Sequence, residues 1–138
     1  MKKLVSGICL VLLLSGNVFA GNDKAVQVEA LARTTASWDG SRLPDYPKGA
    51  PEVTILRIKI PPGGQLPLHT HPVINAGILL SGALTVVTEG NKTLHLKAGE
   101  AIVEVVNTWH SGKNEGLEPA EIVVFYAGVV DTPITVRK

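Results

Sequence analysis

The sequence predicts an all-β fold of the sandwich or barrel class, on three observations. From Glu52 onward, short runs rich in β-branched residues follow one another, and each ends in turn residues such as Gly, Asn or Ser. The first run, residues 52–60, alternates apolar and polar side chains with the period of two that is typical of a strand. No ten-residue stretch of this part carries the apolar stripe of a helix.

The expected strands follow in order along the chain. In the first, Leu56, Ile58 and Ile60 share one face, Arg57 and Lys59 take the other, and Pro-Pro-Gly-Gly at 61–64 ends the run. The later strands are expected at residues 75–80, 83–88, 93–96, 101–106 and 121–126, with a last one at 133–136.

Residues 1–20 have the layout of a secretory signal peptide. Lys2 and Lys3 precede a mostly apolar run at 4–16, and Val-Phe-Ala at 18–20 supplies the small-residue cleavage site. The run is shorter than the roughly 18 residues of a membrane-spanning helix. We therefore expect an exported protein, periplasmic or secreted; an uncleaved membrane anchor is the alternative.

Residues 21–51 form an N-terminal extension and loop, and residues 52–138 a single β-barrel domain. A short strand is expected at Ala25–Leu31. Three prolines and two glycines make 37–51 an irregular loop, which Trp38, Leu43 and Tyr46 would pin to the core.

Composition narrows the chemistry. The chain has 13 basic and 12 acidic residues, and removal of the two signal lysines leaves 11 against 12, so neither nucleic acid nor an anionic membrane is an expected partner. Cys9, the single cysteine, lies in the signal segment, which leaves the mature chain without a disulfide or thiol nucleophile. Its chemistry must rest on other polar side chains, histidine among them.

Three of the four histidines are candidates for a metal site. His69 and His71 would project from the same face of an extended segment, although two surface histidines on a loop would look the same. His110 follows a β run and a tight turn, and three imidazoles converge if its strand folds back beside the first pair. Such a set suits Zn²⁺, Fe²⁺, Mn²⁺, Ni²⁺ or Cu²⁺. His95, between two inward leucines, is expected at the surface.

These residues resemble the two motifs of the cupin superfamily, small β-barrels of the jelly-roll type. The first motif runs Gly, His-x-His, Glu, Gly; here Gly63 or Gly64 leads to the histidine pair, then Asn75, then Gly82. The second runs Gly, Pro-x-Gly, His, Asn; residues 99–114 match its spacing, with Val105 and Asn107 in place of Pro and Gly. Asn107 suits a turn because Asn adopts left-handed backbone geometry readily. The resemblance implies a small single-domain cupin of the type-2 kind.

The resemblance also implies the ligand set His69, His71 and His110, with Asn75 at the position of the family's Glu. Asn75 offers a neutral oxygen, so the three histidines would leave a divalent ion its full charge and open coordination positions. The alternative is a cupin that no longer needs a metal.

The surroundings of the site are less determined by the sequence. We expect Glu104 on the outside of the barrel, the alternative being a partner for a histidine N–H, and Tyr126 in the core, the alternative being a phenol donor at the site. Trp109 should point away from the metal face, and Asn114 should tie down a turn. The pocket mouth is expected to be lined by apolar residues, namely Leu68, Val73, Ile78, Leu80, Val103, Val105 and Phe125.

Three functions remain open at this stage. The first is a metal-dependent, oxygenase-like enzyme acting on a small molecule, since three-histidine iron sites occur in thiol and diketone dioxygenases of the superfamily. The second is a non-catalytic module that binds a small ligand or a metal, and the third is a structural barrel without metal. The family also implies a possible homodimer.

Overall fold

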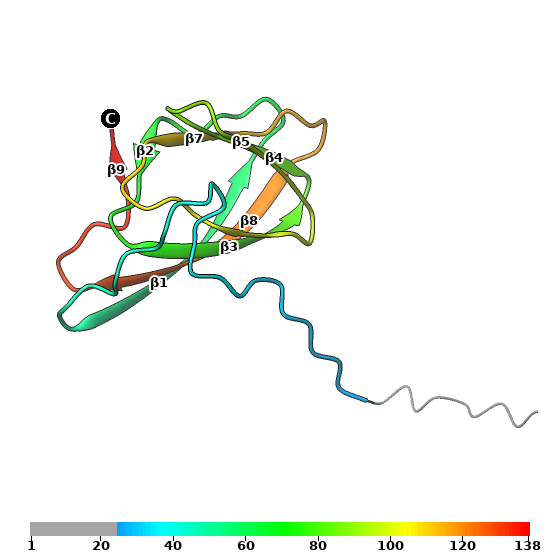
Figure 1. Cartoon of the computed structure of the whole chain (residues 1–138). Coiled ribbons are helices and arrows are strands. Elements are labelled where there is room, and N and C mark those ends of the chain that lie inside the picture. Colours follow the sequence, from blue (N-terminus) through cyan, green and yellow to red (C-terminus); the bar gives the residue numbers. More distant parts are fainter. Residues whose placement is uncertain (1–24) are drawn as a thin grey trace, which may run out of the picture.

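The computed structural model describes residues 25–138, and Figure 1 shows them as two facing layers of strands. The predicted signal peptide, residues 1–20, lies outside the described residues. Residues 25–35 run as an extended arm without a strand partner, so the strand expected at Ala25–Leu31 is wrong. A segment becomes a strand only when the backbone N–H and C=O groups of a neighbouring strand pair with its own. This arm has no such neighbour, and its Val26 and Val28 side chains are exposed.

Nine strands make up the described part of the chain. They are β1 Pro51–Ile60, β2 His69–Thr70, β3 Ile74–Ser81, β4 Ala83–Thr88, β5 Thr93–Lys97, β6 Ala101–Val103, β7 His110–Lys113, β8 Ala120–Val129 and β9 Val136–Arg137. One sheet has the order β1-β8-β3-β6 and the other β5-β4-β7-β2-β9, and all strand pairs within them are antiparallel. The all-β, jelly-roll prediction is confirmed, and the two sheets face each other as a sandwich.

The longest ladder joins β1 to β8 and shows why the pattern of the sequence works. Ile58 lies opposite Ile122 and Ile60 opposite Ala120, so these inward side chains build the core. On the other face, Arg57 and Lys59 both form ion pairs with Glu121. Over residues 57–60 the period of two therefore separates a buried face from a charged one, as expected for this end of β1.

Hydrogen bonds hold the beginning of the loop at 37–51 against the end of β6. The backbone N–H of Trp38 donates to the Val103 carbonyl at 2.9 Å, and the Ser37 hydroxyl donates to the Glu104 carbonyl at 2.8 Å. Trp38 packs on the core as expected and Leu43 is half-buried, but Tyr46 is 74% exposed, so its predicted anchoring role is wrong.

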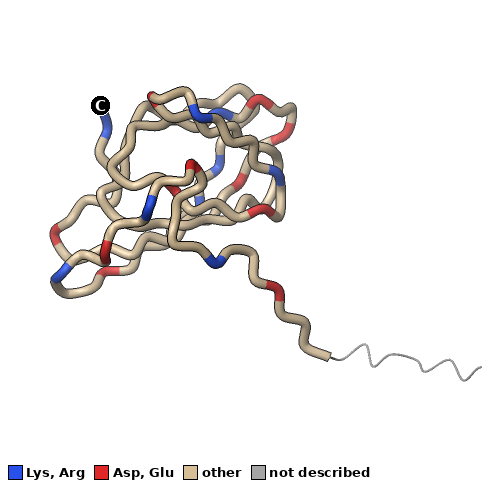
Figure 2. Tube along the Cα trace, in the orientation of Figure 1, with Lys and Arg blue, Asp and Glu red and all other residues tan. Residues whose placement is uncertain are grey.

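Charged side chains are spread over the molecule, as Figure 2 shows: acidic and basic residues alternate along the loops and strand edges without a face of one sign in this view. Within residues 25–138 the structure contains no helix long and apolar enough to cross a membrane.

Candidate metal centre

The three candidate histidines lie together, on β2, directly after it, and at the start of β7. His69 is the cross-strand partner of His110 in the ladder between β2 and β7. The imidazole rings of His69, His71 and His110 stand 4.3–5.0 Å apart, centroid to centroid. The convergence that the spacing suggested is therefore present in the fold.

The geometry of the cluster suits a single ion. One nitrogen from each ring lies within 4.8 Å of the other two, and the residues are only 8%, 3% and 1% exposed. Imidazole nitrogens bind Zn²⁺ at about 2.0–2.1 Å, so small side-chain rotations would bring all three to one centre. The cluster could hold a divalent metal ion.

Backbone carbonyls fix the tautomer of every ring. Nδ1 of His69 lies 2.7 Å from the Pro67 oxygen, Nδ1 of His71 lies 2.8 Å from the Ile134 oxygen, and Nδ1 of His110 lies 2.9 Å from the Thr108 oxygen. Because a carbonyl oxygen only accepts, each Nδ1 must carry the proton and donate it. Each Nε2 then keeps its lone pair, which is the arrangement that metal-binding histidines adopt.

Asn75 lies on β3 and faces the same interior. Its Nδ2 donates to the Val73 carbonyl at 3.3 Å, which leaves Oδ1 directed away from that carbonyl. Asn75 is 1% exposed, and Oδ1 has no hydrogen-bond partner among the described residues. The structure thus brings all four predicted site residues to one region of the sandwich.

Glu104 is also in this region, and the prediction that it faces outward is wrong. β6 ends at Val103, which pairs with Ala76, and the Glu104 N–H donates to the Asn75 carbonyl at 3.1 Å. Continuation of this register makes Glu104 the neighbour of Asn75 on the inward face. The run Ala-Ile-Val-Glu-Val-Val does not indicate the inward face, because apolar residues take both faces there.

Burial governs the protonation of these groups. It lowers the pKa of His71 to about 4, against its hydrogen bond to Ile134 and with help from His110 and His69. It also lowers the pKa of His110. Burial disfavours the charged form of a carboxyl group as well, so it raises the pKa of Glu104 to about 7. His71 and His110 are therefore held in the neutral form that a metal ligand needs.

Unpartnered polar atoms concentrate at the site. Five buried side-chain N or O atoms lack a hydrogen-bond partner among the described residues, and three of them are Oδ1 of Asn75, Oε2 of Glu104 and Nε2 of His110. Buried polar atoms are normally paired, because an unpaired one costs roughly 1–3 kcal/mol. With Glu104 ionised, all three are acceptors with free lone pairs, and a bound cation would satisfy them together. The residues present fit a metal ion.

A cavity of about 550 Å³ opens beside the histidines. Its walls are mainly apolar and come from both sheets, and they include Leu56, Ile58, Leu66, Leu84, Ile122 and Val124. The residues predicted to line the pocket are elsewhere: Val73 and Val105 are buried in the interior, while Ile78, Leu80 and Phe125 are exposed on the far face of the β1-β8-β3-β6 sheet. That prediction failed because it did not separate the two faces of each strand.

Three polar residues line the cavity near the histidines: Tyr126, for which the sequence leaves a role at the site open, and Thr135 and Arg137, which the sequence does not indicate. Tyr126 lines the cavity, its ring 5.4 Å from that of His71, so both readings of it hold: it is buried and it reaches the site. Burial, with the charge of Glu104, raises its pKa to about 12, which keeps the phenol protonated. Thr135 lies 3.2 Å from Nδ1 of His71, and Arg137 stands opposite His69. Only the register of β9 reveals the last two.

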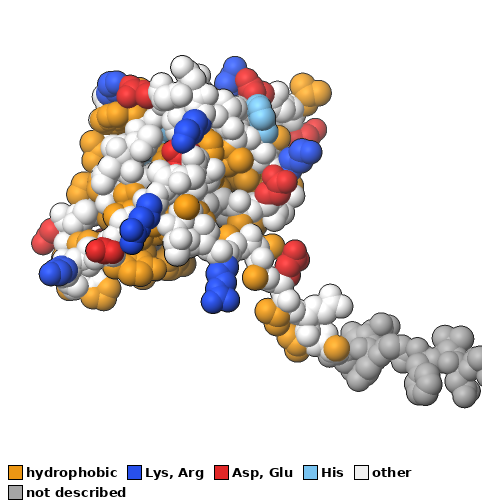
Figure 3. All heavy atoms as spheres, in the orientation of Figure 1, with side chains coloured by type: hydrophobic (Ala, Val, Ile, Leu, Met, Phe, Trp, Pro, Cys, Tyr) orange, Lys and Arg blue, Asp and Glu red, His pale blue; other side chains and the backbone are white. Residues whose placement is uncertain are grey.

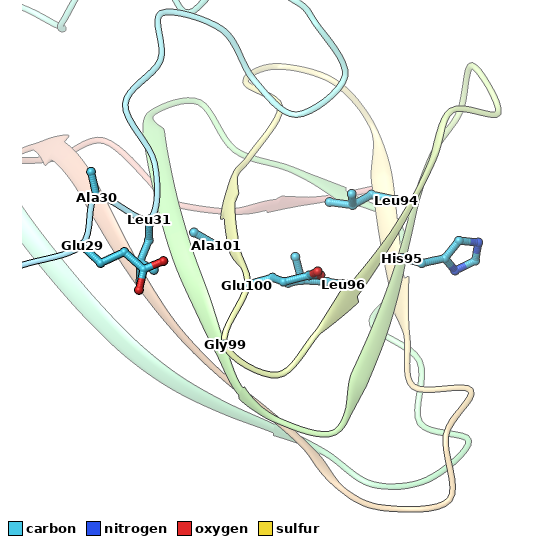
Figure 4. Close-up of a pocket in the computed structure, with 9 residues that line it drawn as sticks. All are labelled: Glu29, Ala30, Leu31, Leu94, His95, Leu96, Gly99, Glu100 and Ala101. Carbon is cyan, nitrogen blue, oxygen red and sulfur yellow. The ribbon is translucent and has the colours of Figure 1, made fainter. Parts of the chain in front are cut away.

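The predictions for His95, Asn114 and Asn107 agree with the structure. Figure 4 shows His95 pointing away from Leu94 and Leu96, and it is exposed on β5 as expected. The Asn114 side chain donates to the Ile60 and Glu118 carbonyls and accepts from the Gly116 N–H, so it ties turns together. Asn107 has the left-handed φ of 55°.

Comparison with protein families gives one match. A family model described as a cupin domain matches residues 56–126, a span that contains His69, His71, Asn75 and His110. No curated protein matches the sequence.

Many solved structures share the fold. A conserved, uncharacterised protein with a double-stranded β-helix domain from Klebsiella pneumoniae subsp. pneumoniae MGH 78578 has a TM-score of 0.55 at 21% identity, over 66% of this chain and 86% of that one. Recombinant oxalate oxidase in complex with glycolate has a TM-score of 0.52 at 22% identity, over 84% and 74%.

Coverage of other chains is only partial. DMSP lyase DddQ from Ruegeria pomeroyi DSS-3 has a TM-score of 0.55 at 21% identity, over 62% of this chain and 43% of the lyase. The match spans 26% of an oxalate decarboxylase from Lactobacillus farciminis. At these identities the similarity establishes a common fold.

Proposed function

This chain belongs to the cupin family, and from that premise we propose that it is an exported metal-binding cupin whose three-histidine centre serves an oxygenase-like reaction on a small molecule. One observation carries the proposal. Backbone carbonyls hold all three Nδ1 protons, so three Nε2 lone pairs are left for one buried ion. Export rests on the signal-like pattern of residues 1–20.

His69, His71 and His110 would hold the ion. A divalent metal bound there would supply a Lewis acid, and iron, manganese or copper would also supply a redox centre. The cavity beside His69 and His71 would give a small molecule access to such an ion, and its mainly apolar walls would strengthen a charge interaction with that molecule. Tyr126 retains its proton below pH 12 and can donate a hydrogen bond to the substrate.

The cavity suggests the kind of substrate. Its volume of about 550 Å³ and its apolar walls suit a small organic molecule. Arg137 at the wall and the charge of the ion would favour an anionic group on that molecule, such as a carboxylate. Two similar structures are named for oxalate, a small dicarboxylate, which agrees with this substrate class.

A non-catalytic binding module is the second candidate. Asn75 favours it, because this residue stands at the family's Glu position and cannot exchange a proton near neutral pH. Against it, the cavity places the protonated phenol of Tyr126, a hydrogen-bond donor for a substrate, beside His71. We therefore rank the enzyme first.

Metal analysis of the untagged mature protein tests the proposal. We expect one divalent ion per chain, lost in His69→Ala and His110→Ala and retained in His95→Ala, the exposed control. Iron-loaded protein should then consume dioxygen with a member of a panel of carboxylates, thiols and diketones. No metal under any loading condition would reject both candidates in their metal-dependent form, whereas bound metal without turnover would favour the binding module.

A further inference from the structure

We propose that Glu104 is the fourth protein ligand of this metal centre and supplies, from the neighbouring strand, the carboxylate that the family motif places at position 75. The inference rests on the proposed metal function and adds a ligand to it.

Positions 75 and 104 are neighbours on the same face. The ladder between β3 and β6 pairs Ala76 with Val103, and the Glu104 N–H donates to the Asn75 carbonyl one step further on. Cross-strand neighbours in an antiparallel pair have Cβ atoms about 4.5–5.5 Å apart and point the same way. A carboxylate at 104 can therefore reach the space that a carboxylate at 75 would occupy.

The distance between Glu104 and His110 fits a shared ion. Oε2 of Glu104 lies 3.6 Å from Nε2 of His110. Metal–nitrogen and metal–oxygen bonds of about 2.0–2.2 Å place two ligand atoms of one tetrahedral ion roughly 3.4 Å apart. The two atoms thus stand near the separation of two ligands of one centre, with no backbone movement required.

Their hydrogen bonding leaves a cation as the natural partner. The proton of His110 is on Nδ1, bonded to the Thr108 carbonyl, so Nε2 presents a lone pair to the carboxylate. Both Oε2 and Nε2 are buried and unpartnered among the described residues. When Glu104 is ionised, two acceptors face each other and repel, and a metal ion between them would satisfy both.

The charge of Glu104 also restores the family's balance. With Asn75, the three histidines and one amide oxygen bring no negative charge to the ion; Glu104 brings one. A carboxylate buried without a partner is costly, whereas one that coordinates a metal is not. The chain would thus retain three nitrogens and one carboxylate as ligands, with the carboxylate provided by the residue directly after β6 in place of one on β3.

Zinc and cobalt binding test the assignment. We would measure Zn²⁺ affinity by chelator competition in the wild type, Glu104→Gln, Asn75→Glu/Glu104→Gln, and Glu52→Gln, an exposed control on β1. Glu104→Gln should weaken Zn²⁺ binding about 100-fold, and the double variant should recover most of that loss. The visible spectrum of the Co²⁺ form should shift in Glu104→Gln and stay unchanged in Glu52→Gln.

The outcomes separate this inference from the proposed function. If His69→Ala abolishes Zn²⁺ binding while Glu104→Gln matches the wild type in affinity and Co²⁺ spectrum, Glu104 is no ligand and the three-histidine centre stands. If the wild type binds neither ion, both proposals fail. Should Glu104→Gln not fold, Glu104→Asp decides: a retracted carboxylate should weaken Zn²⁺ binding and shift the Co²⁺ spectrum, and wild-type behaviour would overturn the assignment.

Discussion

Asn114 connects three segments of backbone through one buried amide. Its Nδ2 donates to the Ile60 carbonyl at 3.0 Å and to the Glu118 carbonyl at 2.8 Å, and its Oδ1 accepts from the Gly116 N–H at 2.9 Å. The side chain is fully buried. It therefore holds the end of β1 against the loop that leads into β8.

Replacement of this amide should cost stability and leave the metal site intact. Asn114→Ala removes three hydrogen bonds and leaves their backbone partners buried, so we expect a loss of about 3 kcal/mol in the free energy of unfolding. Urea denaturation measures it, and Zn²⁺ affinity of the folded variant should equal that of the wild type. A loss below roughly 1 kcal/mol, or weaker metal binding, would contradict this role.

At the level of single residues, the sequence could identify what motif spacing encodes. His69, His71, Asn75 and His110 were found in this way, and the left-handed turn at Asn107 followed from the preference of Asn. Glu104 was assigned to the wrong face, because its inward position depends on register with Asn75 and not on its own neighbours. Residues brought in by distant strands leave no local pattern.

Among the elements, strands with strict alternation and clear turns were predicted best. The bounds of β4 match the expected 83–88, and β1 and β5 differ by one residue at an end. β6 is shorter than expected because the chain leaves the ladder with β3 after Glu104, and Val106 then forms a parallel bridge with His71. The last strand lies at Val136–Arg137, where its partner is β2. Which strands pair with each other depends on the whole sheet, so a short stretch of sequence does not indicate it.

On the scale of the whole molecule, the outer face of the β1-β8-β3-β6 sheet carries a group of exposed apolar side chains. The ladders place Ile55, Phe125 and Ala76 in one cross-strand row, so these residues share that face. Ile55 is 63% exposed and Phe125 44%, with Val53, Ile78 and Leu80 nearby. Figure 3 shows hydrophobic side chains gathered over this layer. Extended apolar patches of this kind mark association surfaces.

We expect a second copy of the chain to cover this face, in agreement with the homodimer expected from the family. Light scattering after gel filtration should give a dimer for the wild type. Phe125→Glu, which places a charge in the centre of the patch, should give a monomer, and Leu117→Glu, on an exposed loop, should remain dimeric. A monomeric wild type at tens of micromolar would contradict the expectation.

The stability of the metal-free molecule depends on pH through opposing contributions from the site. His71 has a folded pKa of about 4 against an ordinary 6.5, so its contribution is complete above pH 6.5 and is lost as the pH falls toward 4. Glu104 has a folded pKa of about 7 against 4.5, so its contribution is complete below pH 4.5 and is lost as the pH rises to 7. Between pH 4.5 and 6.5 the two slopes oppose each other.

Replacement of Glu104 should leave the histidines as the main source of the pH dependence of the free energy of unfolding. In chelator-treated Glu104→Gln, the free energy of unfolding should rise with pH between 4.5 and 6.5, more steeply than in the wild type by about 1.4 kcal/mol per pH unit. At pH 7 the metal-free variant should be more stable than the wild type by up to roughly 3 kcal/mol, because it no longer buries a carboxylate. Urea denaturation at each pH, with Glu52→Gln as control, measures both effects. Saturating Zn²⁺ should make the wild type the more stable protein at pH 7, since only the wild type has the Glu104 carboxylate to bind the ion. Parallel pH profiles for the two metal-free proteins would contradict the prediction, because they would mean that Glu104 titrates alike in the folded and unfolded chains.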